Sequence, residues 1–285
     1  MLKKLEEQDF DRYVEFAYEL ALDVTKSGYP TYADGIKTKD DFVARARKGF
    51  SHENEEILLY ERGGKVVGWI HYYYLPEDHY LDTNSFCVAE GTKEALKEFT
   101  AFARKHFPGS ELYLGFPEEN REAVTALAAY GFERIEESYN DVLDLDRYTL
   151  LPENADIILI TRENFRLFAE IHAQHKDDMY WTSQRILNAI DEWRIFVLMR
   201  EGKAAGAIYS RIFEDKTVSE IFGTDFANGV YDSGVYRDLL TAMINDDKRR
   251  GVKHMVFFNE ENSQSDALAC GFRRVGKYVC FKIRL

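Results

Sequence analysis

Hydrophobic and polar residues follow the same order twice along the chain. Two β-hairpins are predicted where an apolar run, a charged glycine-containing turn and a second apolar run follow one another, at 57–70 and at 196–208. Glycine supplies the positive φ that such a tight turn requires. Apolar residues at a spacing of three to four predict a helix early in each copy, at 10–20 and at 164–171. The pattern therefore predicts two copies of one fold.

The later elements repeat as well. Long amphipathic helices are predicted at 93–106 and 235–249, and strands follow them at 111–115 and 254–258. Because strands and helices alternate in the second half of each copy, we expect an α/β fold of the α+β type. Each copy should hold a mixed, mostly antiparallel sheet flanked by helices.

Short motifs recur at matching distances. Gly68 of the first hairpin precedes Gly131 by 63 residues, and Gly206 precedes Gly271 by 65. This period is far longer than the 20–50 residues of stacked repeats, so it indicates duplicated domains. The matching motifs are Pro117-Glu-Glu-Asn120 with Asn259-Glu-Glu-Asn262, and Ala129-Tyr-Gly-Phe-Glu-Arg134 with Ala269-Cys-Gly-Phe-Arg-Arg274.

A boundary is predicted between Asp146 and Asp156. The segment 147–155 contains a proline and has no sustained periodicity, and it separates a strand-like ending from a new apolar run, 157–160. The sequence thus predicts an N-terminal domain, 1–146, and a C-terminal domain, 156–285.

Composition limits the partners. The chain has 285 residues, 45% of them hydrophobic, and a charge balance of 37 − 50 = −13. That acidic balance disfavours nucleic acid, whose phosphates are bound by clustered Lys and Arg. No signal sequence or membrane-length apolar run occurs, so we expect a cytoplasmic protein that does not bind membranes. Cys87, Cys270 and Cys280 form no CxxC pair and are expected to be buried free thiols.

The order of elements and the late motif resemble the GNAT acyltransferase superfamily. Its domains run β-α-α-β-β-β-α-β-α-β and bind acetyl-CoA where two central parallel strands splay apart. The clearest match is Asn120-Arg-Glu-Ala-Val-Thr-Ala-Leu-Ala-Ala-Tyr-Gly-Phe132, and the second copy, 262–272, is two residues shorter. The resemblance covers nearly the whole chain twice.

The resemblance places acetyl-CoA in the second copy. In the family, a loop of small residues before the long helix holds the pyrophosphate with backbone N–H groups. The first copy is four residues shorter at this loop, whereas the second keeps its length, with Gly234 at the first conserved glycine. Tyr231 and Tyr236 depart from the family pattern, and Asp232 adds a negative charge. The implied cofactor-binding residues are Phe226, Ala227, Gly234, Val235, Tyr236, Arg237 and Asn262.

Glu220 is the predicted general base. It resembles the catalytic glutamate of histone-modifying members, and it precedes Phe226 by six residues, which predicts one face of the strand for both. The backbone N–H at about Phe226 or Ala227 would then contact the thioester oxygen. Asp82 takes the equivalent position in the first copy. The family's usual acid position holds Leu or Ala here, so Tyr278 is the nearest replacement.

Other residues have a structural and a functional interpretation. His172 and His175 have the spacing of metal ligands on a helix, beside Asp177 and Asp178, but no third ligand group is apparent. We therefore expect surface polar residues and no metal. The aromatic segments could either line an acceptor site or belong to the core; they are 29–32, 69–74 and 179–182.

The sequence predicts an N-acetyltransferase. The second copy would transfer acetyl from acetyl-CoA to a primary amine of a small or peptide substrate, by direct attack in a ternary complex. The acidic surface favours a cationic amine. The alternative is a non-catalytic tandem module in which both copies have lost the phosphate loop. An aminoacyl-tRNA-dependent ligase is disfavoured by the net charge, and the sequence leaves open whether the chain forms a homodimer.

Overall fold

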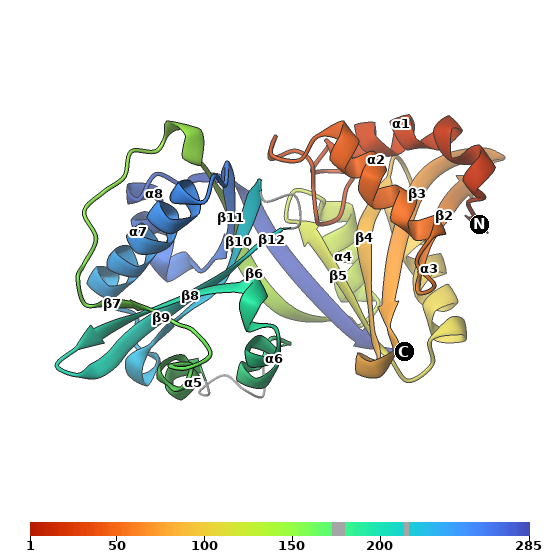
Figure 1. Ribbon diagram of the computed structural model, residues 1–285. Coiled ribbons are helices and arrows are strands. Elements are labelled where there is room, and N and C mark those ends of the chain that lie inside the picture. Colours follow the sequence, from red (N-terminus) through yellow and green to blue (C-terminus); the bar gives the residue numbers. More distant parts are fainter. Residues whose placement is uncertain (173–179, 214–216) are drawn as a thin grey trace. The chain divides into compact units, whose positions relative to one another are not determined.

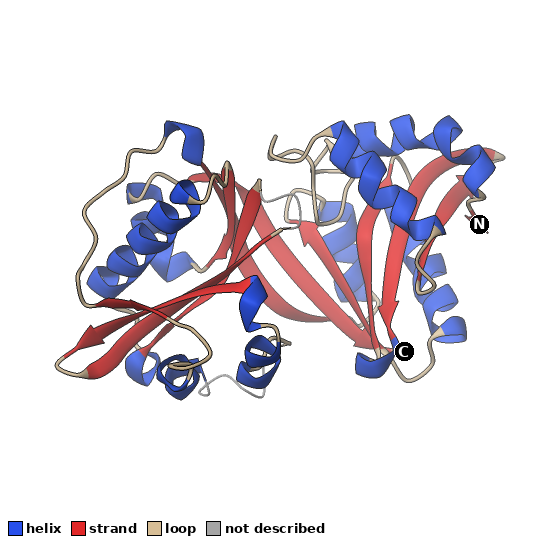
Figure 2. Ribbon diagram, viewed as in Figure 1, coloured by secondary structure: helices blue, strands red, loops and turns tan. Residues whose placement is uncertain are grey.

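The computed structural model describes residues 1–172, 180–213 and 217–285. The chain forms two compact units. Unit 1 comprises Met1–Glu137 together with Gly276–Leu285, and unit 2 comprises Ser138–Val275. Each unit contains strands with helices beside them (Figure 2).

Unit 1 contains one sheet with four helices. Its strands lie in the order β1 (Leu2–Lys4), β2 (Glu55–Arg62), β3 (Lys65–Leu75), β4 (Tyr80–Val88), β5 (Glu111–Pro117) and β12 (Arg273–Arg284). Neighbours are antiparallel except β4 and β5, which are parallel. The helices are α1 (Phe10–Ala21), α2 (Lys39–Arg47), α3 (Thr92–His106) and α4 (Arg121–Ala129).

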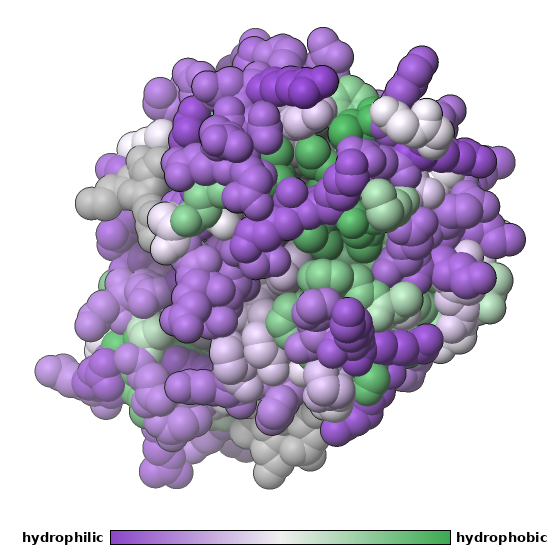
Figure 3. Space-filling model, turned by 90° about the vertical axis from the view of Figure 1, so that its right-hand side faces the viewer, coloured by the Kyte–Doolittle hydropathy of each residue, from purple (hydrophilic) through white to green (hydrophobic). Residues whose placement is uncertain are grey.

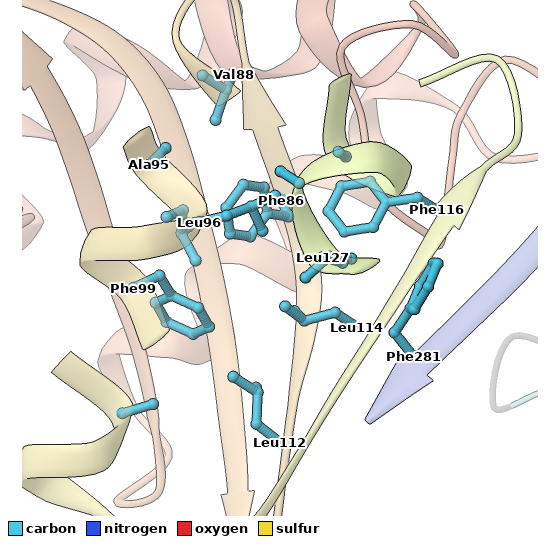
Figure 4. Packing of buried hydrophobic residues seen from close by; sticks show 14 of the residues in the cluster. Phe86, Val88, Ala95, Leu96, Phe99, Leu112, Leu114, Phe116, Leu127 and Phe281 are labelled. Carbon is cyan, nitrogen blue, oxygen red and sulfur yellow. The ribbon is translucent and has the colours of Figure 1, made fainter. Parts of the chain in front are cut away.

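The alternation along β2 explains why helices cover both faces of the unit 1 sheet (Figure 1). Leu58 and Tyr60 belong to the core beneath α3 and α4, whereas Ile57 and Leu59 belong to the core beneath α1 and α2. Figure 4 shows the α3 and α4 side of this core, where Phe281 of β12 lies among residues of β4, β5 and the two helices. The last strand of the chain thus completes the core of the first unit.

Unit 2 repeats the arrangement. Its strands lie in the order β6 (Glu133–Asp144), β11 (His254–Asn259), β10 (Val218–Phe226), β9 (Lys203–Ile212), β8 (Trp193–Arg200) and β7 (Ile157–Leu159). Only β10 and β11 are parallel among these described pairs. The helices are α5 (Arg166–His172), α6 (Ser183–Asn188), α7 (Ser233–Arg249) and α8 (Gln264–Ala269). One core lies beneath α7 and α8 and another beneath α5 and α6.

Short 3-10 helices connect the main elements. They are η1 (Glu7–Asp9), η2 (Lys48–Phe50), η3 (Pro76–Asp78), η4 (Leu145–Arg147), η6 (Ile190–Glu192), η7 (Ala227–Gly229) and η8 (Glu261–Ser263).

The two copies exchange their last strands. Residues Tyr139–Asp144 of β6 pair with β11 of the second copy, and Tyr278–Arg284 of β12 pair with β5 of the first copy. The chain therefore passes from unit 1 to unit 2 within β6 and returns within β12. The compact units differ for this reason from the sequence copies 1–146 and 156–285. Because both copies have the same fold, β6 and β12 are equivalent strands, and each can pair with the free edge of either β5 or β11.

The surface agrees with the charged composition. Hydrophilic residues dominate the face drawn in Figure 3, and hydrophobic residues gather near its middle. Among the described residues, no helix is long and apolar enough to cross a membrane. Cys87, Cys270 and Cys280 are free and buried, which confirms the prediction for the thiols.

Candidate functional site

In each unit the two central parallel strands pair only at their beginnings. β4 and β5 pair from Tyr80 with Glu111 to Leu81 with Leu112. β10 and β11 pair from Val218 with His254 to Ile221 with Phe257. β4 and β10 then continue alongside their antiparallel neighbours, so each unit has the splayed pair of strands that the family resemblance predicts.

A β-bulge marks the same place in both splayed strands. The extra residue is Asn84 in β4, between the pairs of His71 with Ser85 and Tyr72 with Thr83, and it is Phe222 in β10. Asp82 and Glu220 each lie two residues before the bulge, which supports their equivalence. The copies thus correspond residue by residue in this strand.

The bulge also corrects one prediction. A six-residue separation puts two side chains on one face only in a regular strand, because the extra residue of a bulge shifts the alternation. Glu220 pairs with Arg211 of β9 and Phe226 pairs with Gly206, and these partners are five residues apart. Glu220 and Phe226 therefore lie on opposite faces. Phe226 contacts the α7 core, whereas the bulge residue Phe222 contacts the α5 core.

In unit 1, the space between the diverging strands β4 and β5 (the splay) is filled by another segment of the same chain. The segment between α1 and α2 lies against both strands: the Gly28 N–H donates to the Phe86 carbonyl at 2.7 Å, and the Tyr29 N–H donates to the Gly115 carbonyl at 2.9 Å. The Asn120 amide donates to the Ser27 carbonyl at 3.2 Å. Backbone groups of β4 and β5 that a ligand could bind are therefore already paired within the protein.

Gly28 makes this close approach possible. A Cβ at Gly28 would lie 3.1 Å from the Gly115 oxygen and 3.2 Å from the Phe86 Cβ. A side chain at this position would therefore crowd both strands and require the segment or its neighbours to shift by a few tenths of an ångström. The sequence contains the glycine, but its role depends on a backbone contact that pattern analysis does not detect.

The phosphate loop of unit 1 is shorter than that of unit 2, as predicted, but by three residues and not by four. Three residues, 89–91, connect β4 to α3, whereas six residues, 227–232, connect β10 to α7. The Glu122 carboxylate accepts a hydrogen bond from the Lys93 N–H in the first turn of α3 at 3.1 Å. A carboxylate of the chain thus occupies a position where a helix N-terminus would otherwise bind an anion.

The corresponding helix of unit 2 also carries a carboxylate at its N-terminus. Asp232 is the N-cap of α7 and accepts from the Val235 N–H at 2.9 Å, and the Arg200 guanidinium donates to it at 2.7 Å. The Val235 hydrogen bond, followed by that of Arg200, lowers the pKa of Asp232. The phosphate loop of unit 2 therefore has the full length that was predicted, but it carries the negative charge of Asp232.

The predicted cofactor residues are distributed around this helix. Phe226 ends β10 with its ring 5.3 Å from that of Tyr231, and Ala227 begins η7. Gly234 and Val235 lie in the first turn of α7. Tyr236 is fully buried and donates its hydroxyl to Asn259 at 3.1 Å.

The remaining two predicted residues face solvent. Arg237 is exposed on α7 and lies 3.5 Å from an oxygen of Asp266. Asn262 is exposed in η8, whereas its sequence counterpart Asn120 is buried as the N-cap of α4. Asn262 therefore does not reproduce the environment of Asn120.

The predicted base and acid lie in different units. Glu220 is half-buried on β10 in unit 2. Tyr278 is on β12 in unit 1, where its ring lies 4.8 Å from that of Tyr29. A Cβ on Gly115 would be 2.4 Å from a ring carbon of Tyr278, so the tyrosine rests directly on the β5 backbone. Strand exchange is the reason that Tyr278 is separate from its own copy.

His172 forms a buried pair with Asp225. The His172 side chain is 1% exposed, its Nδ1 lies 2.8 Å from an Asp225 oxygen, and its Nε2 lies 2.9 Å from the Trp181 carbonyl. Burial alone would lower the pKa of His172, but the two hydrogen bonds raise it. Because a carbonyl and a carboxylate both accept, both ring nitrogens carry protons in this arrangement. The prediction that His172 is a surface residue is wrong.

The other residues of the predicted metal-like spacing lie outside the described part of the chain; they are His175, Asp177 and Asp178. Among the described residues, no three His, Cys, Asp or Glu side chains gather as a metal site. Tyr29 and Tyr32 are buried, which favours the core interpretation of the 29–32 segment.

Solved structures resemble the chain over most of its length. A GCN5-related N-acetyltransferase from Sphaerobacter thermophilus is 13% identical, with a TM-score of 0.65, over 99% of this chain and 95% of that one. A tandem GNAT protein from the clavulanic acid biosynthesis pathway is 17% identical, with a TM-score of 0.53, over 99% and 98%. A GCN5-related N-acetyltransferase from Kribbella flavida is 12% identical, with a TM-score of 0.53, over 84% and 93%.

No family model and no curated protein sequence matches the chain. The structural likeness nevertheless defines the class of fold. The chain has the fold of the GNAT superfamily, which confirms the predicted resemblance and the predicted fold class. At these sequence identities the likeness concerns the fold.

Proposed function

We propose that the protein is an acyl-CoA-dependent N-acyltransferase whose unit 2 binds acetyl-CoA and transfers the acetyl group to a primary amine. One observation carries the choice of unit. The loop before α7 of unit 2 has six residues, whereas the loop before α3 of unit 1 has three and the segment 26–29 lies between β4 and β5. Unit 1 would then have no donor site of its own.

Acetyl-CoA would supply an activated thioester, and the protein would supply position and a base. The backbone at Phe226 and Ala227 lies at the end of the splayed strand, where a thioester oxygen would need an N–H donor. Glu220 would accept the proton that the amine loses as it attacks the thioester carbon. Tyr278 has no part in this proposal, because burial raises the pKa of its hydroxyl well above the ordinary value and makes it a poor proton donor to a leaving thiolate. The acceptor is a cationic amine of a small molecule or peptide, favoured by the net charge of −13.

Isothermal titration calorimetry of acetyl-CoA binding to the full chain tests the donor site. We expect one site per chain. Asp232→Asn should strengthen binding several-fold, because the amide keeps an oxygen for the Val235 N–H and removes a negative charge beside the pyrophosphate. Asp144→Asn is the matched control, since Asp144 is another partly exposed carboxylate of unit 2 that caps a turn and pairs with an arginine. Equal affinities in both variants would contradict the proposed position.

Turnover tests the base separately. Glu220→Gln should lower kcat with an amine acceptor and leave the acetyl-CoA Kd nearly unchanged. Asp82→Asn makes the matched change at the equivalent position of unit 1 and should leave both quantities unchanged. Equal loss in the two variants would contradict an active site in unit 2 alone.

A non-catalytic tandem module is the second candidate. It is favoured by the Asp232 carboxylate on the first turn of α7 and by the fully buried Tyr236 ring, which replaces a small residue of the family loop. In this function both units keep the fold and neither binds CoA. Absence of acetyl-CoA binding at millimolar concentration, in wild type and in Asp232→Asn, is the result that would favour this candidate.

A further inference from the structure

An aromatic cluster surrounds a carboxylate in unit 1. Asp82 accepts hydrogen bonds from the Tyr80 hydroxyl at 2.8 Å, the Tyr73 hydroxyl at 3.3 Å and the Thr83 N–H at 2.6 Å. The Tyr80 ring stacks on that of Tyr113 at a centroid distance of 4.5 Å. These side chains are half-buried, so the cluster remains accessible from solvent.

The register places the cluster on one face of the sheet. Tyr73 pairs directly with Asp82 across β3 and β4, and Tyr80 pairs with Glu111 at the start of the parallel strands. Tyr113 lies two residues beyond Glu111 and therefore on the same face. The neighbouring residues Leu81 and Leu112 point instead into the core beneath α3 and α4. The aromatic face is therefore the one opposite to that core.

Asp82 differs from the carboxylates beside it in having no basic partner among the described residues. Glu55 of the same face is bound by both guanidinium nitrogens of Arg45, at 2.7 and 3.0 Å. Glu56 is bound by Lys4 at 2.6 Å. Among the described residues, the side chains that donate hydrogen bonds to Asp82 are those of Tyr73 and Tyr80, which are neutral. Lys282, which pairs with Tyr113 in the sheet, lies 3.7 Å from Glu111.

This isolation has an electrostatic consequence. Burial raises the pKa of Asp82 to about 6, although the hydrogen bonds from Thr83, Tyr80 and Tyr73 oppose the rise. A partly buried carboxylate is costly to ionise without a counter-ion. A cation at this place would both neutralise the carboxylate and contact the electron-rich faces of the rings.

We propose that unit 1 holds a binding site for an organic ammonium ion, in which the Asp82 carboxylate pairs with the cationic nitrogen and Tyr73, Tyr80 and Tyr113 supply the aromatic surface. The site is separate from the proposed donor site of unit 2, and it requires no CoA. Unit 1 would therefore bind a ligand although its own splay is closed. The same position of unit 2 is different, because Glu220 pairs in the sheet with Arg211, which lies over Trp181 and Trp193.

Choline and its neutral isostere 3,3-dimethyl-1-butanol are the probes. Each is titrated into the full chain without CoA at constant ionic strength, so that general attraction to an acidic protein is the same throughout. Binding is followed by NMR of 13C-labelled aspartate carboxyl groups, and the Asp82 signal is assigned by its loss in Asp82→Asn. We expect choline to bind at least tenfold more tightly than the alcohol and to lower the pKa of Asp82.

Asp82→Asn should weaken choline binding about tenfold or more, whereas Asp144→Asn, the same change at a partly exposed carboxylate of unit 2 that pairs with Arg147, should leave it unchanged. Tyr113→Leu is the second variant if Asp82→Asn does not fold, and it should weaken binding several-fold while the carboxylate remains. Equal binding of choline and the alcohol, equal binding in Asp82→Asn, or an Asp82 pKa that choline does not lower would each overturn the proposal. Loss of acetyl-CoA binding in unit 2 would not affect it.

Discussion

The buried pair of His172 and Asp225 makes the stability of unit 2 depend on pH. Asp225→Asn is the most informative perturbation, because it removes the charge and keeps the shape. The new amide can donate its N–H to Nδ1 of a neutral ring, while Nε2 continues to donate to the Trp181 carbonyl. The substitution should therefore replace a charged pair by a neutral one that is still fully hydrogen-bonded.

The sign of the effect follows from the raised pKa of His172. The stability that the pair contributes is fully present below the unfolded value, about 6.5, and is lost as the pH rises through the folded value. One proton gives a slope of at most about 1.4 kcal/mol per pH unit. In Asp225→Asn this slope should disappear in the pH range that begins at about 6.5 and ends at the raised pKa of the folded protein.

A second substitution measures how much the pair contributes to the free energy of unfolding. Asp225→Leu removes the partner and leaves the imidazolium uncompensated, and breaking a buried pair in this way costs about 3–5 kcal/mol. Screening by solvent is small, since the two side chains are 1% and 5% exposed. The loss should be largest below about pH 6.5 and should become smaller as the pH rises through the raised pKa of the folded protein, where the wild-type ring loses its charge.

Tryptophan fluorescence can report unit 2 alone. The chain contains Trp69 in unit 1 and Trp181 and Trp193 in unit 2, so a Trp69→Phe background restricts the signal to the second unit. Urea denaturation at several pH values then gives the free energy of unfolding for each variant. Asp144→Asn, an exposed carboxylate of the same unit, is the control and should not change the slope. A profile for Asp225→Asn that runs parallel to wild type would refute the reasoning.

Three further predictions concern stability. Gly28→Ala should destabilise unit 1 by about 1–3 kcal/mol, because the added Cβ meets backbone and ring atoms. Gly276→Ala is the control and should be nearly neutral, since its Cβ meets nothing nearer than 3.6 Å. Equal melting temperatures of the two variants would contradict the close approach at Gly28. A fragment 138–275 should give a folded circular dichroism spectrum and cooperative melting. The fragment 156–285, in which β11 would have to pair with β12 instead of β6, should melt at a lower temperature; equal melting would show that strand exchange is dispensable. Arg45→Met should cost about 1.5–3 kcal/mol near pH 7. The hydrogen bonds of Glu55, which include those from Arg45, hold its pKa well below the ordinary value, so the cost should become smaller as the pH falls below about 4, where the unfolded chain and the variant take up the proton first. Urea midpoints that fall equally at pH 7 and pH 3 would exclude a charge effect.

Periodicity predicted the elements well because they depend on local burial. The expected long helices, 93–106 and 235–249, correspond to α3 and α7, and the expected hairpins correspond to β2 with β3 and to β8 with β9. The duplicated glycines and the matched loop lengths also identified the two copies. These signals arise from side chains that alternate between core and solvent, which each short segment records in its own sequence.

Contacts between segments that are distant in the sequence cannot be predicted from hydrophobic periodicity. Pairing of β12 with β5 depends on which of two equivalent edges the last strand reaches, and both strands have the same pattern. The bulge at Phe222 adds one residue to an otherwise regular alternation, so the face of Glu220 was assigned wrongly. The spacing of His172 predicts a surface residue because the partner that makes it buried, Asp225, lies 53 residues away in the chain. Asp232 is three residues before Val235, the spacing of a helix N-cap, so its capping role is a local signal that the sequence does contain.

The exchange of strands affects whether the gene could lose one of its two repeats during evolution. A gene that lost its first repeat would also lose β6, and β11 would have to pair with β12 of its own copy instead. A gene that lost its second repeat would lose β12, and β5 would have to pair with β6 instead. In the exchanged arrangement each repeat therefore supplies a strand to the other, whether or not it binds a ligand. Selection can retain the closed first copy for its strand alone, which leaves its surface free to acquire a different ligand.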